Sequence, residues 1–305
     1  MQVPYVTLND GYRMPFFGLG TYSLKGDEAE AAIEYAIDIG YRHFDTAYLY
    51  NNEKEVGNAV RKKINDGTVK REDLFITTKL NLKTHHESIV IVSCKESLRR
   101  LGLDYVDLFL IHSPVSLKET DDNEKVLPSD IDYIETWRGM EECKRLGLAR
   151  SIGVSNFNSE QIERLISAAK IKPVNNQIEV TLNLNQKSLI QFCKNHDITV
   201  TGYSPLGKPN KRPHIKDLWQ HPKVQDLSKK YNKTPAQISL RFVLQMGAAP
   251  IPKSSSKTRI MENFDVFDFN FSDEEMNALQ DIGSGDRVVP LNELKDAKYY
   301  PFNIA

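Results

Sequence analysis

The sequence lacks the features that mark several classes of protein. Its 305 residues include 40 lysines and arginines against 41 aspartates and glutamates, so the formal net charge is −1. Such a balance gives no field that would recruit nucleic acid or an anionic membrane. No apolar run approaches the roughly 20 residues that a membrane-spanning helix needs, and the amino terminus has no basic stretch followed by an apolar one. We therefore expect neither a signal peptide nor a membrane or nucleic-acid partner.

Cysteines are few and show no paired spacing. The three of them, Cys94, Cys143 and Cys193, favour a reduced intracellular protein over a disulfide framework. Cys94 falls on an apolar helical stripe, so core packing is its expected role. His85 and His86 are adjacent instead of four residues apart, and no G-x-S-x-G motif occurs. We expect no metal site and no serine nucleophile.

Strand-like and helix-like segments alternate along the chain. With 40% apolar and 27% charged residues, the chain is typical of a globular protein with a large core. A hairpin is predicted first, from 6 to 17, with its turn at Asn9-Asp10-Gly11. Eight strand candidates follow, at Gly18–Gly20, His43–Asp45, Leu74–Lys79, Val106–His112, Ser151–Ser155, Asn175–Val180, Ile198–Tyr203 and Ala249–Ile251.

Helix signals lie between these strands. Periodic apolar stripes run from Ala32 to Ile37, ending at Gly40 as a left-handed cap, and from Ile162 to Ala169. Helix starts are predicted at Thr234-Pro235 and at the capping box that opens with Ser272. Two long loops, 113–129 and 204–221, and a mostly irregular tail from 283 to 305 complete the predicted organisation.

Eight strand–helix units favour a single (β/α)₈ barrel domain, residues 1–305, with an N-terminal β-hairpin and long loops at the C-terminal face. The alternative is a doubly wound sheet, which usually has fewer strands. A nucleotide-binding sheet of that kind would carry G-x-G-x-x-G after its first strand, and Gly18-Leu19-Gly20 lacks the third glycine. The barrel is the fold that we predict.

The predicted strands end in polar groups. A barrel enzyme works at the C-terminal ends of its strands, and those positions are Asp45, Lys79, His112, Ser155, 177–179, Tyr203 and Lys253, with Tyr50 five residues after Asp45. A carboxylate, a phenol, an ammonium and an imidazole together form a site for proton transfer. Taken singly, the four could instead be a helix cap, a half-buried aromatic, a surface lysine and a core histidine.

Five segments then resemble the signature segments of the aldo-keto reductases. They are GYRHFDTAYLYNNE (40–53), LFITTKL (74–80), LFLIHSP (108–114), IGVSNF (152–157) and IPKSSSKTRIMEN (251–263), in the family's order and spacing over nearly the whole chain. Within the family, the chain is most similar to the animal aldose and aldehyde reductase-like, hydroxysteroid-handling branch, with the insect members as a candidate subgroup.

The resemblance implies a catalytic tetrad of Asp45, Tyr50, Lys79 and His112. Hydride addition to a carbonyl carbon leaves an oxyanion that needs a proton, which Tyr50 would supply. Its unperturbed pKa is about 10, and a neighbouring Lys79 ammonium is expected to lower it. Asp45 would hold Lys79, and His112 would orient the carbonyl oxygen.

The resemblance also implies NADPH as the cofactor. Ser155, Asn156 and Gln177 match positions that hold the nicotinamide carboxamide, and Tyr203 matches the ring that stacks on it. A 2′-phosphate would lie near two cations and a hydroxyl, which suits a dianion. The remaining positions match family residues that contact the rest of the dinucleotide, from the nicotinamide to the adenine. The implied cofactor set is Gly20, Thr21, Tyr22, Asp45, Ser155, Asn156, Gln177, Tyr203, Ser204, Leu206, Lys253, Ser254, Arg259, Glu262 and Asn263.

The substrate side departs from the family pattern. Asn81 stands where many members carry a tryptophan that walls the pocket, so a wider or more polar pocket is expected there. The positions implied for the substrate are Tyr22, Leu49, Tyr50, Asn81, His112 and Tyr300, with the tail expected to fold over the mouth. An apolar or ring-bearing carbonyl compound fits this set, and a ketosteroid such as a 3-dehydroecdysteroid is a candidate for an insect member.

The resulting hypothesis is a cytoplasmic, monomeric reductase that acts on small carbonyl compounds with NADPH. Two alternatives stay open at this point. A barrel that binds the cofactor without turnover would be expected to lose part of the tetrad, whereas all four positions are intact. A hydrolase with paired carboxylates or a metal would act without a nicotinamide cofactor.

Overall fold

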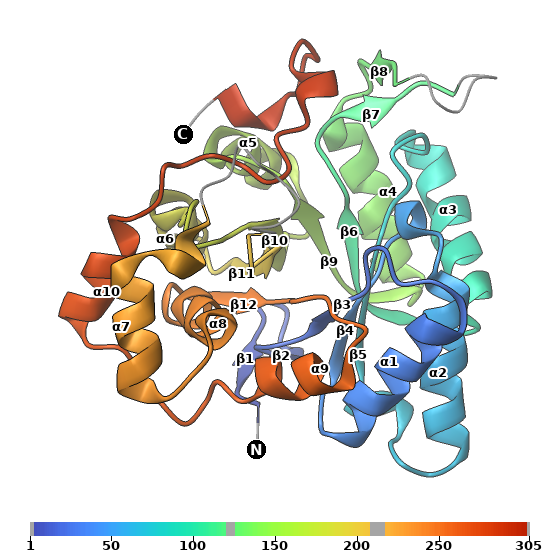
Figure 1. Cartoon of the computed structure of the whole chain (residues 1–305). Coiled ribbons are helices and arrows are strands. Elements are labelled where there is room, and N and C mark those ends of the chain that lie inside the picture. The colour runs from blue at the N-terminus through green and yellow to red at the C-terminus, as the bar shows by residue number, and fades with distance from the viewer. Residues whose placement is uncertain (1–2, 120–125, 208–216, 304–305) are drawn as a thin grey trace.

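The protein is an eight-stranded parallel barrel surrounded by helices (Figure 1). The computed structural model describes residues 3–119, 126–207 and 217–303. The strands neighbour one another in the order β12-β11-β10-β9-β6-β5-β4-β3. Their bounds are β3 Leu19–Gly20, β4 His43–Asp45, β5 Phe75–Lys79, β6 Val106–Ile111, β9 Ala149–Ser155, β10 Asn175–Glu179, β11 Thr199–Tyr203 and β12 Ala248–Pro250.

Hydrogen bonds between the first and last strands close the barrel. The Gly18 N–H donates to the Pro250 carbonyl oxygen and the Gly20 N–H to that of Pro252, each at 3.1 Å. A Cβ on Gly20 would lie 2.6 Å from the carbonyl oxygen of Ile251, so this approach requires a glycine. The eight predicted strands are all present within a residue or two of their expected ends, and the predicted barrel is confirmed.

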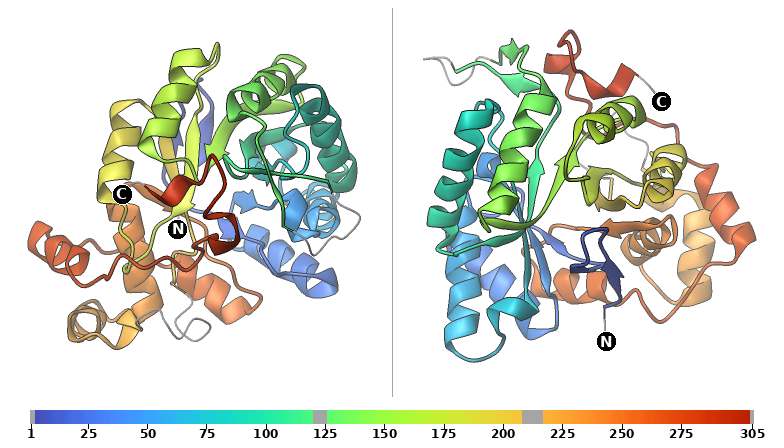
Figure 2. Two further views of the ribbon diagram at one scale, coloured as in Figure 1. Left: turned by 90° about the horizontal axis from the view of Figure 1, so that it is seen from above. Right: turned by 180° about the vertical axis from the view of Figure 1, so that it is seen from behind.

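Helices cover the outside of the barrel, and two of them lie beyond the strand–helix repeat (Figure 2). α7 and α10 pack on α8 instead of on the sheet. The bounds are α1 Gly26–Asp38, α2 Glu53–Asn65, α3 Glu87–Leu101, α4 Tyr133–Arg145, α5 Ser159–Ala168, α6 Lys187–Asn195, α7 Pro222–Tyr231, α8 Pro235–Gln245, α9 Lys257–Phe264 and α10 Asp273–Gln280.

The predicted hairpin plugs the end of the barrel opposite the functional face. Strands β1 (Tyr5–Thr7) and β2 (Arg13–Pro15) pair antiparallel. Leu8 and Met14 of this hairpin are buried in one apolar cluster with Phe75, Leu108 and Leu110 from the barrel strands. The hairpin therefore covers the N-terminal end of the barrel with apolar side chains.

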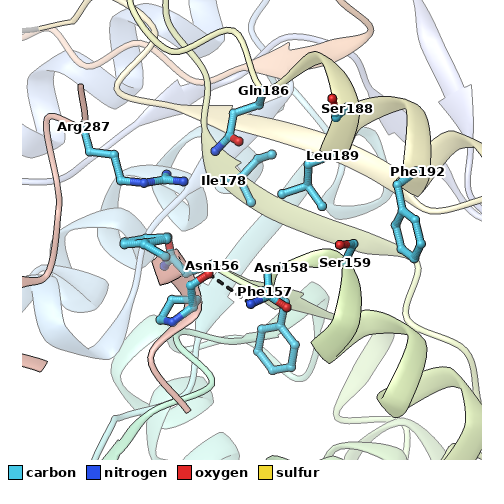
Figure 3. Close-up of a pocket in the computed structure, with 12 residues that line it drawn as sticks. Asn156, Phe157, Asn158, Ser159, Ile178, Gln186, Ser188, Leu189, Phe192 and Arg287 are labelled. Carbon is cyan, nitrogen blue, oxygen red and sulfur yellow. Dashed lines mark hydrogen bonds between the residues drawn. The ribbon is translucent and has the colours of Figure 1, made fainter. Parts of the chain in front are cut away.

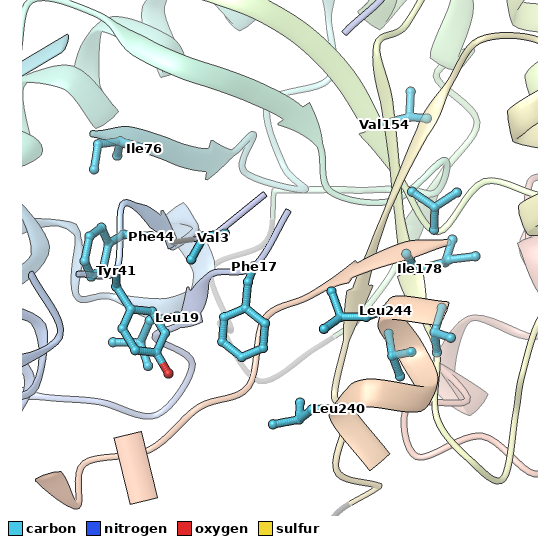
Figure 4. Packing of buried hydrophobic residues seen from close by; sticks show 14 of the residues in the cluster. Val3, Phe17, Leu19, Tyr41, Phe44, Ile76, Val154, Ile178, Leu240 and Leu244 are labelled. Atoms are coloured by element: carbon cyan, nitrogen blue, oxygen red, sulfur yellow. The ribbon is translucent and has the colours of Figure 1, made fainter. Parts of the chain in front are cut away.

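A larger apolar core lies between the barrel and its helices (Figure 4). On one side, Phe17 packs edge-on against Tyr41, with ring centroids 5.7 Å apart, and Tyr41 stacks on Phe264 at 4.4 Å. The Tyr41 hydroxyl donates to the carbonyl oxygen of Ile260, which satisfies its polar end. Cys94 is fully buried in this core, as predicted.

Local sequence signals set several element ends. Thr234 is the predicted N-cap and Ser272 opens the predicted capping box, and each accepts a backbone N–H three residues on. Thr234 also completes a capping box with Gln237, which was not predicted. Gly40 follows α1 with φ +110°, the predicted left-handed conformation. Unpredicted are the small β7–β8 pairing (Ser116–Leu117 with Pro128–Ser129) and the 3₁₀ turn η3 (Leu218–Gln220), which lie within the segments expected to be loops. Residues 120–125 and 208–216 of those two loops lie outside the described residues.

The C-terminal tail returns to the functional face. Apart from the 3₁₀ turns η4 (Asn292–Leu294) and η5 (Pro301–Asn303) it is irregular, as predicted. Seen from above, it crosses the C-terminal end of the barrel (Figure 2). The Glu179 carboxylate accepts the N–H groups of Val288 and Val289, at 2.7 and 2.9 Å, and fixes this crossing to the end of β10.

Candidate active site

Four titratable side chains meet where three neighbouring strands end. Asp45 is the last residue of β4, Lys79 the last of β5, and His112 follows β6 directly. Tyr50 comes from the 3₁₀ turn η1 (Tyr48–Tyr50) after β4. Because these strands are parallel neighbours, their C-terminal ends lie at one rim. The structure therefore brings the four sequence-predicted residues together.

Lys79 is the centre of this cluster. Its ammonium nitrogen lies 2.6 Å from Asp45 Oδ1, 3.2 Å from the Tyr50 hydroxyl and 3.0 Å from the carbonyl oxygen of Thr46. Its side chain is fully buried, so an unpaired charge there would be costly. With three acceptors the ammonium uses its whole donor capacity, and it holds the carboxylate and the phenol in fixed relation.

The turn that carries Tyr50 is fixed by a buried amide. Asn52 Nδ2 donates to the carbonyl oxygens of Thr21 and Leu24, and Asn52 Oδ1 accepts from the Thr46 hydroxyl. On the outside, Lys25 donates to the carbonyl oxygen of Tyr50 at 2.7 Å. These bonds anchor both sides of η1. The sequence analysis did not identify Asn52 or Lys25, because neither residue type is distinctive without the contacts.

His112 lies beside the phenol at the mouth. Its ring meets the Tyr50 ring nearly at right angles (78°), with centroids 5.8 Å apart. Its main chain is held by Asn156 Nδ2, which donates to the His112 carbonyl oxygen at 2.9 Å. His112 Nδ1 is buried without a hydrogen-bond partner in the described structure, as are both ring nitrogens of His85, an electrostatic neighbour of His112. Sequence reasoning set His85 aside because its spacing suggests no metal site.

Burial governs the protonation of the cluster. It raises the pKa of Tyr50 well above its usual value, and the Asp45 carboxylate adds to this shift. Burial lowers the pKa of His112, with the Lys79 charge acting in the same direction. The expectation that Lys79 lowers the pKa of Tyr50 does not hold in the protein alone, because burial raises that pKa and the Asp45 carboxylate raises it further. At neutral pH the site therefore holds a protonated phenol beside a neutral imidazole.

The residues predicted for the nicotinamide form a connected group on β9, β10 and β11. The Tyr203 hydroxyl donates to Asn156 Oδ1 at 2.8 Å, and the Ser155 hydroxyl donates to the Gln177 carbonyl oxygen. Gln177 Nε2 donates to Asp45 Oδ2 at 2.7 Å, a link to the tetrad that the sequence did not reveal. Asn156 has φ +62°, a strained conformation typical of functional sites.

The chain after β3 lines the same rim. Thr21 donates through both its N–H and its hydroxyl to the Asp45 carbonyl oxygen, at 3.0 and 2.9 Å. Tyr22 is 53% exposed, and its ring centroid lies 5.2 Å from that of Tyr50. Ser204 follows β11 with φ +50°. Leu206 packs against the core at the start of the loop whose residues 208–216 lie outside the described part.

The residues predicted for the adenosine end follow β12. Lys253 and Arg259 are exposed, Ser254 is buried, and Glu262 and Asn263 lie further along α9. This helix starts at Lys257 with Ser256 as its N-cap, so a helix N-terminus adds its partial positive charge to the basic side chains. Since the segment after β12 runs beside Gly20, the two predicted ends of the cofactor site belong to one rim. The donor set fits a phosphorylated dinucleotide with a carboxamide at its other end.

The predicted substrate residues are less closely joined. Leu49 is 53% exposed beside the phenol-bearing turn. Asn81 Oδ1 accepts the Lys83 N–H within its own loop, and the Tyr300 hydroxyl donates to the Pro290 carbonyl oxygen within the tail. Among the described residues, no hydrogen bond joins Asn81 or Tyr300 to the tetrad. They lie on the loop after β5 and on the tail that crosses the barrel end.

Two other classes of site find no support in the described ranges. Among those residues, no group of three or more histidine, cysteine, aspartate or glutamate side chains could bind a metal ion. No described helix is both long enough and apolar enough to cross a bilayer.

Fold and site together define a barrel oxidoreductase, and comparison with known proteins gives its family. Residues 17–284 match the model of the aldo/keto reductase family. The chain is 43% identical to estradiol 17 beta-dehydrogenase 5 of Mus musculus, with 97% of each chain covered, and 43% identical to aldo-keto reductase AKR2E4 of Bombyx mori, with 99% of each covered. The chain therefore belongs to the aldo/keto reductase family, as its motifs predicted.

Solved structures agree with this assignment. The Bombyx mori AKR2E4 structure, in complex with NADP, superposes with a TM-score of 0.93 at 42% identity and covers 99% of both chains. The structure of AKR2E5 complexed with NADPH gives a TM-score of 0.93 at 40% identity, covering 100% of this chain and 95% of the other. The predicted cofactor is thus the one carried by two similar structures.

Proposed function

We propose that the protein reduces aldehydes or ketones with NADPH, and that Tyr50 is the general acid. This proposal rests on one observation: the Lys79 ammonium, which forms a buried ion pair with Asp45, also donates a hydrogen bond to the Tyr50 hydroxyl. NADPH, when bound, supplies the hydride. Every other requirement of the reaction, a proton, an orienting group and exclusion of water, falls to side chains of this chain.

Proton delivery follows from the arrangement around Tyr50. Its raised pKa keeps the phenol protonated at neutral pH, so the proton is available when the substrate oxygen becomes basic. As the proton leaves, the phenolate that forms is stabilised by the Lys79 ammonium, 3.2 Å away. Asp45 keeps that ammonium charged and in place. The interaction between Lys79 and Tyr50 is thus strongest when charge develops, which is the condition for catalysis.

His112 orients the carbonyl group. Its lowered pKa keeps the imidazole neutral, so one ring nitrogen donates and the other accepts. A neutral donor beside the phenol would hold the carbonyl oxygen without competing for the proton. Asn156 fixes the backbone of His112 and is also a predicted carboxamide partner, so it couples the two halves of the site.

The residues fit the cofactor at both of its ends. Asn156, Gln177 and Ser155 present amide and hydroxyl groups for a carboxamide, and Lys253 and Arg259 with the α9 N-terminus suit a 2′-phosphate. That charge favours NADPH over NADH. The alternative, a barrel that binds the cofactor without turnover, gains no support from the intact tetrad, in which Lys79 bonds both Asp45 and Tyr50.

We infer an apolar substrate, with a steroid ketone such as a 3-dehydroecdysteroid as the candidate. Support comes from the exposed Tyr22 and Leu49 beside the phenol, from Asn81 in place of a bulky wall, and from a relative whose name states a steroid substrate, the estradiol dehydrogenase. A panel of aldehydes, aromatic ketones, sugars and ketosteroids, followed by NADPH oxidation with NADH in parallel, ranks these classes. Preference for sugars over ketosteroids would overturn the substrate assignment.

Tyr50→Phe tests the mechanism, with Tyr48→Phe in the same turn as its matched control. We expect Tyr50→Phe to lower kcat by about 10²–10⁴-fold while NADPH binding, followed by fluorescence titration, stays unchanged. Tyr48 packs against the Arg100 guanidinium, whereas the phenol that Lys79 bonds is that of Tyr50, so the Tyr48 variant should keep activity. Full activity in Tyr50→Phe would show that another group donates the proton.

We also propose that the protein acts as a cytoplasmic monomer. The near-balanced charge and the three free, buried cysteines support this, since neither points to secretion or to a covalent partner. Sedimentation velocity measures the mass in solution, and cell fractionation places the protein. A dimer mass or a membrane-bound fraction would contradict the proposal.

A further inference from the structure

A pocket separate from the tetrad lies under the C-terminal tail (Figure 3). Its volume is about 220 Å³, and it extends from Arg287 of the tail to Phe192 of α6. The first turns of α5 and α6 form its walls. Asp45, Tyr50, Lys79 and His112 are not among its lining residues.

Arg287 supplies a cation with spare binding capacity. Its Nη1 atom is buried and has no hydrogen-bond partner among the described residues. The guanidinium lies 3.8 Å from the centroid of the Phe302 ring, and it interacts electrostatically with the Glu179 carboxylate. Both Glu179 oxygens accept backbone N–H groups of the tail. A buried guanidinium nitrogen without an acceptor is costly, and a carboxylate is the group whose geometry suits it best.

The rest of the pocket favours an anion with an apolar body. α5 begins at Ser159 and α6 at Lys187, and Ser159 and Ser188 both line the cavity, so two helix N-termini face it. No side chain caps the start of α6, and the lining residues include no carboxylate. Leu189 and Phe192 provide an apolar wall at the far end from Arg287.

Size and charge narrow the ligand class. The cavity is smaller than the roughly 300–1,000 Å³ of sites for drug-sized ligands, so only a small molecule fits. A single guanidinium with an apolar wall suits a monoanion better than a phosphate dianion, which needs more than one cation. We propose that this pocket binds a small organic carboxylate, with its carboxylate on Arg287 and its apolar body against Leu189 and Phe192.

A ligand in this pocket would contact three parts of the protein: the C-terminal tail, α5 and α6. Arg287, Pro301 and Phe302 belong to the tail, whereas Ser159 and Leu189 belong to α5 and α6. Asn156 stands at the edge of the pocket and bonds both the His112 carbonyl oxygen and the Tyr203 hydroxyl. A carboxylate bound here therefore holds the tail down and contacts a residue of the proposed nicotinamide site. The binding itself does not depend on turnover.

Calorimetric titration with phenylacetate tests the proposal, on the protein with and without saturating NADP⁺. We expect Arg287→Gln to weaken binding by about 10- to 100-fold, since a hydrogen bond to a charged group is worth about 1.5–3 kcal/mol. Lys295→Gln removes the same charge from an exposed position of the tail and should change nothing. The neutral phenylacetamide should bind the unaltered protein at least about tenfold more weakly than phenylacetate.

A second variant separates this pocket from the tetrad, where an anion could also bind. Leu189→Trp fills the apolar end without touching Arg287, so it should abolish phenylacetate binding while circular dichroism shows an unchanged fold. If Arg287→Gln and Leu189→Trp both bound phenylacetate as tightly as the unaltered protein does, the carboxylate would lie elsewhere and the proposal would be overturned. Equal affinity for the amide, or no binding to the unaltered protein at millimolar phenylacetate, would also overturn it.

Discussion

Acid should destabilise the protein through two buried histidines. His43 and His85 are fully buried, and burial lowers their pKa values to about 4 and about 3. In the unfolded chain both return to about 6.5. Between the folded and unfolded values the unfolded state binds more protons, so the free energy of unfolding rises with pH across that window. Stability is therefore lost as the pH falls below about 6.5.

The size of the loss follows from the pKa difference. Each histidine costs about 1.4 kcal/mol per pH unit within the window. Between about pH 7.5 and about pH 5.5, stability is lost only over the lower pH unit, below the unfolded-state pKa of about 6.5. Each histidine therefore lowers the free energy of unfolding by about 1.4 kcal/mol, and the pair lowers it by about 2.7 kcal/mol. The result is insensitive to the folded pKa values, provided that both lie below pH 5 or so.

His85→Leu isolates one of these contributions. Neither ring nitrogen of His85 has a partner in the described structure, so leucine removes no hydrogen bond, and the bond from Thr136 goes to the backbone oxygen and survives. Urea unfolding at the two pH values should show a pH-induced loss about 1.4 kcal/mol smaller in the variant than in the unaltered protein. His86→Leu is the control, because that ring is largely in solvent. An equal loss in His85→Leu and the unaltered protein would refute the reasoning.

Three further predictions concern single charged side chains. Asp45→Asn leaves the Lys79 ammonium buried without its counter-ion, so urea unfolding should show a loss of about 3–5 kcal/mol, whereas the exposed Asp66→Asn should not. Arg259→Gln should weaken NADPH binding by about tenfold and leave NADH binding unchanged in fluorescence titrations. Glu179→Gln keeps only one strong acceptor for Val288 and Val289, so limited proteolysis should cut the tail sooner; an unchanged rate would show that other contacts hold the tail.

The barrel could be predicted because short stretches of the sequence carry the signals for its strands. Strands such as β5 and β6 are short runs rich in apolar residues that end at or just before a polar residue. Capping residues such as Thr234 and Ser272 mark helix starts without reference to the rest of the chain. The β7–β8 pairing was missed because it joins two-residue segments that carry no periodicity. α7 and α10 contribute to packing on α8, which no local pattern distinguishes from packing on the sheet.

The residues of the candidate site could be predicted from the sequence, but their hydrogen bonds and pKa shifts could not. Residue type and position at strand ends brought out Asp45, Lys79 and His112. Desolvation, however, is a property of the folded environment, so the sequence predicted a lowered pKa for Tyr50 where burial raises it. Asn52 was missed for a similar reason, since an amide that satisfies three partners looks like any other asparagine until the chain has folded.

Gln177 shows why the connections matter for function. The resemblance assigns it to the cofactor, yet its Nε2 donates to the Asp45 oxygen that Lys79 does not use. Asp45 therefore receives one bond from each side of the barrel, from β5 through Lys79 and from β10 through Gln177. Because the second bond fixes the carboxylate that orients Lys79, a rearrangement of Gln177 on cofactor binding would be transmitted to Tyr50. The proposed proton donor, Tyr50, is in this way positioned through Gln177, a residue that is also proposed to bind the nicotinamide cofactor.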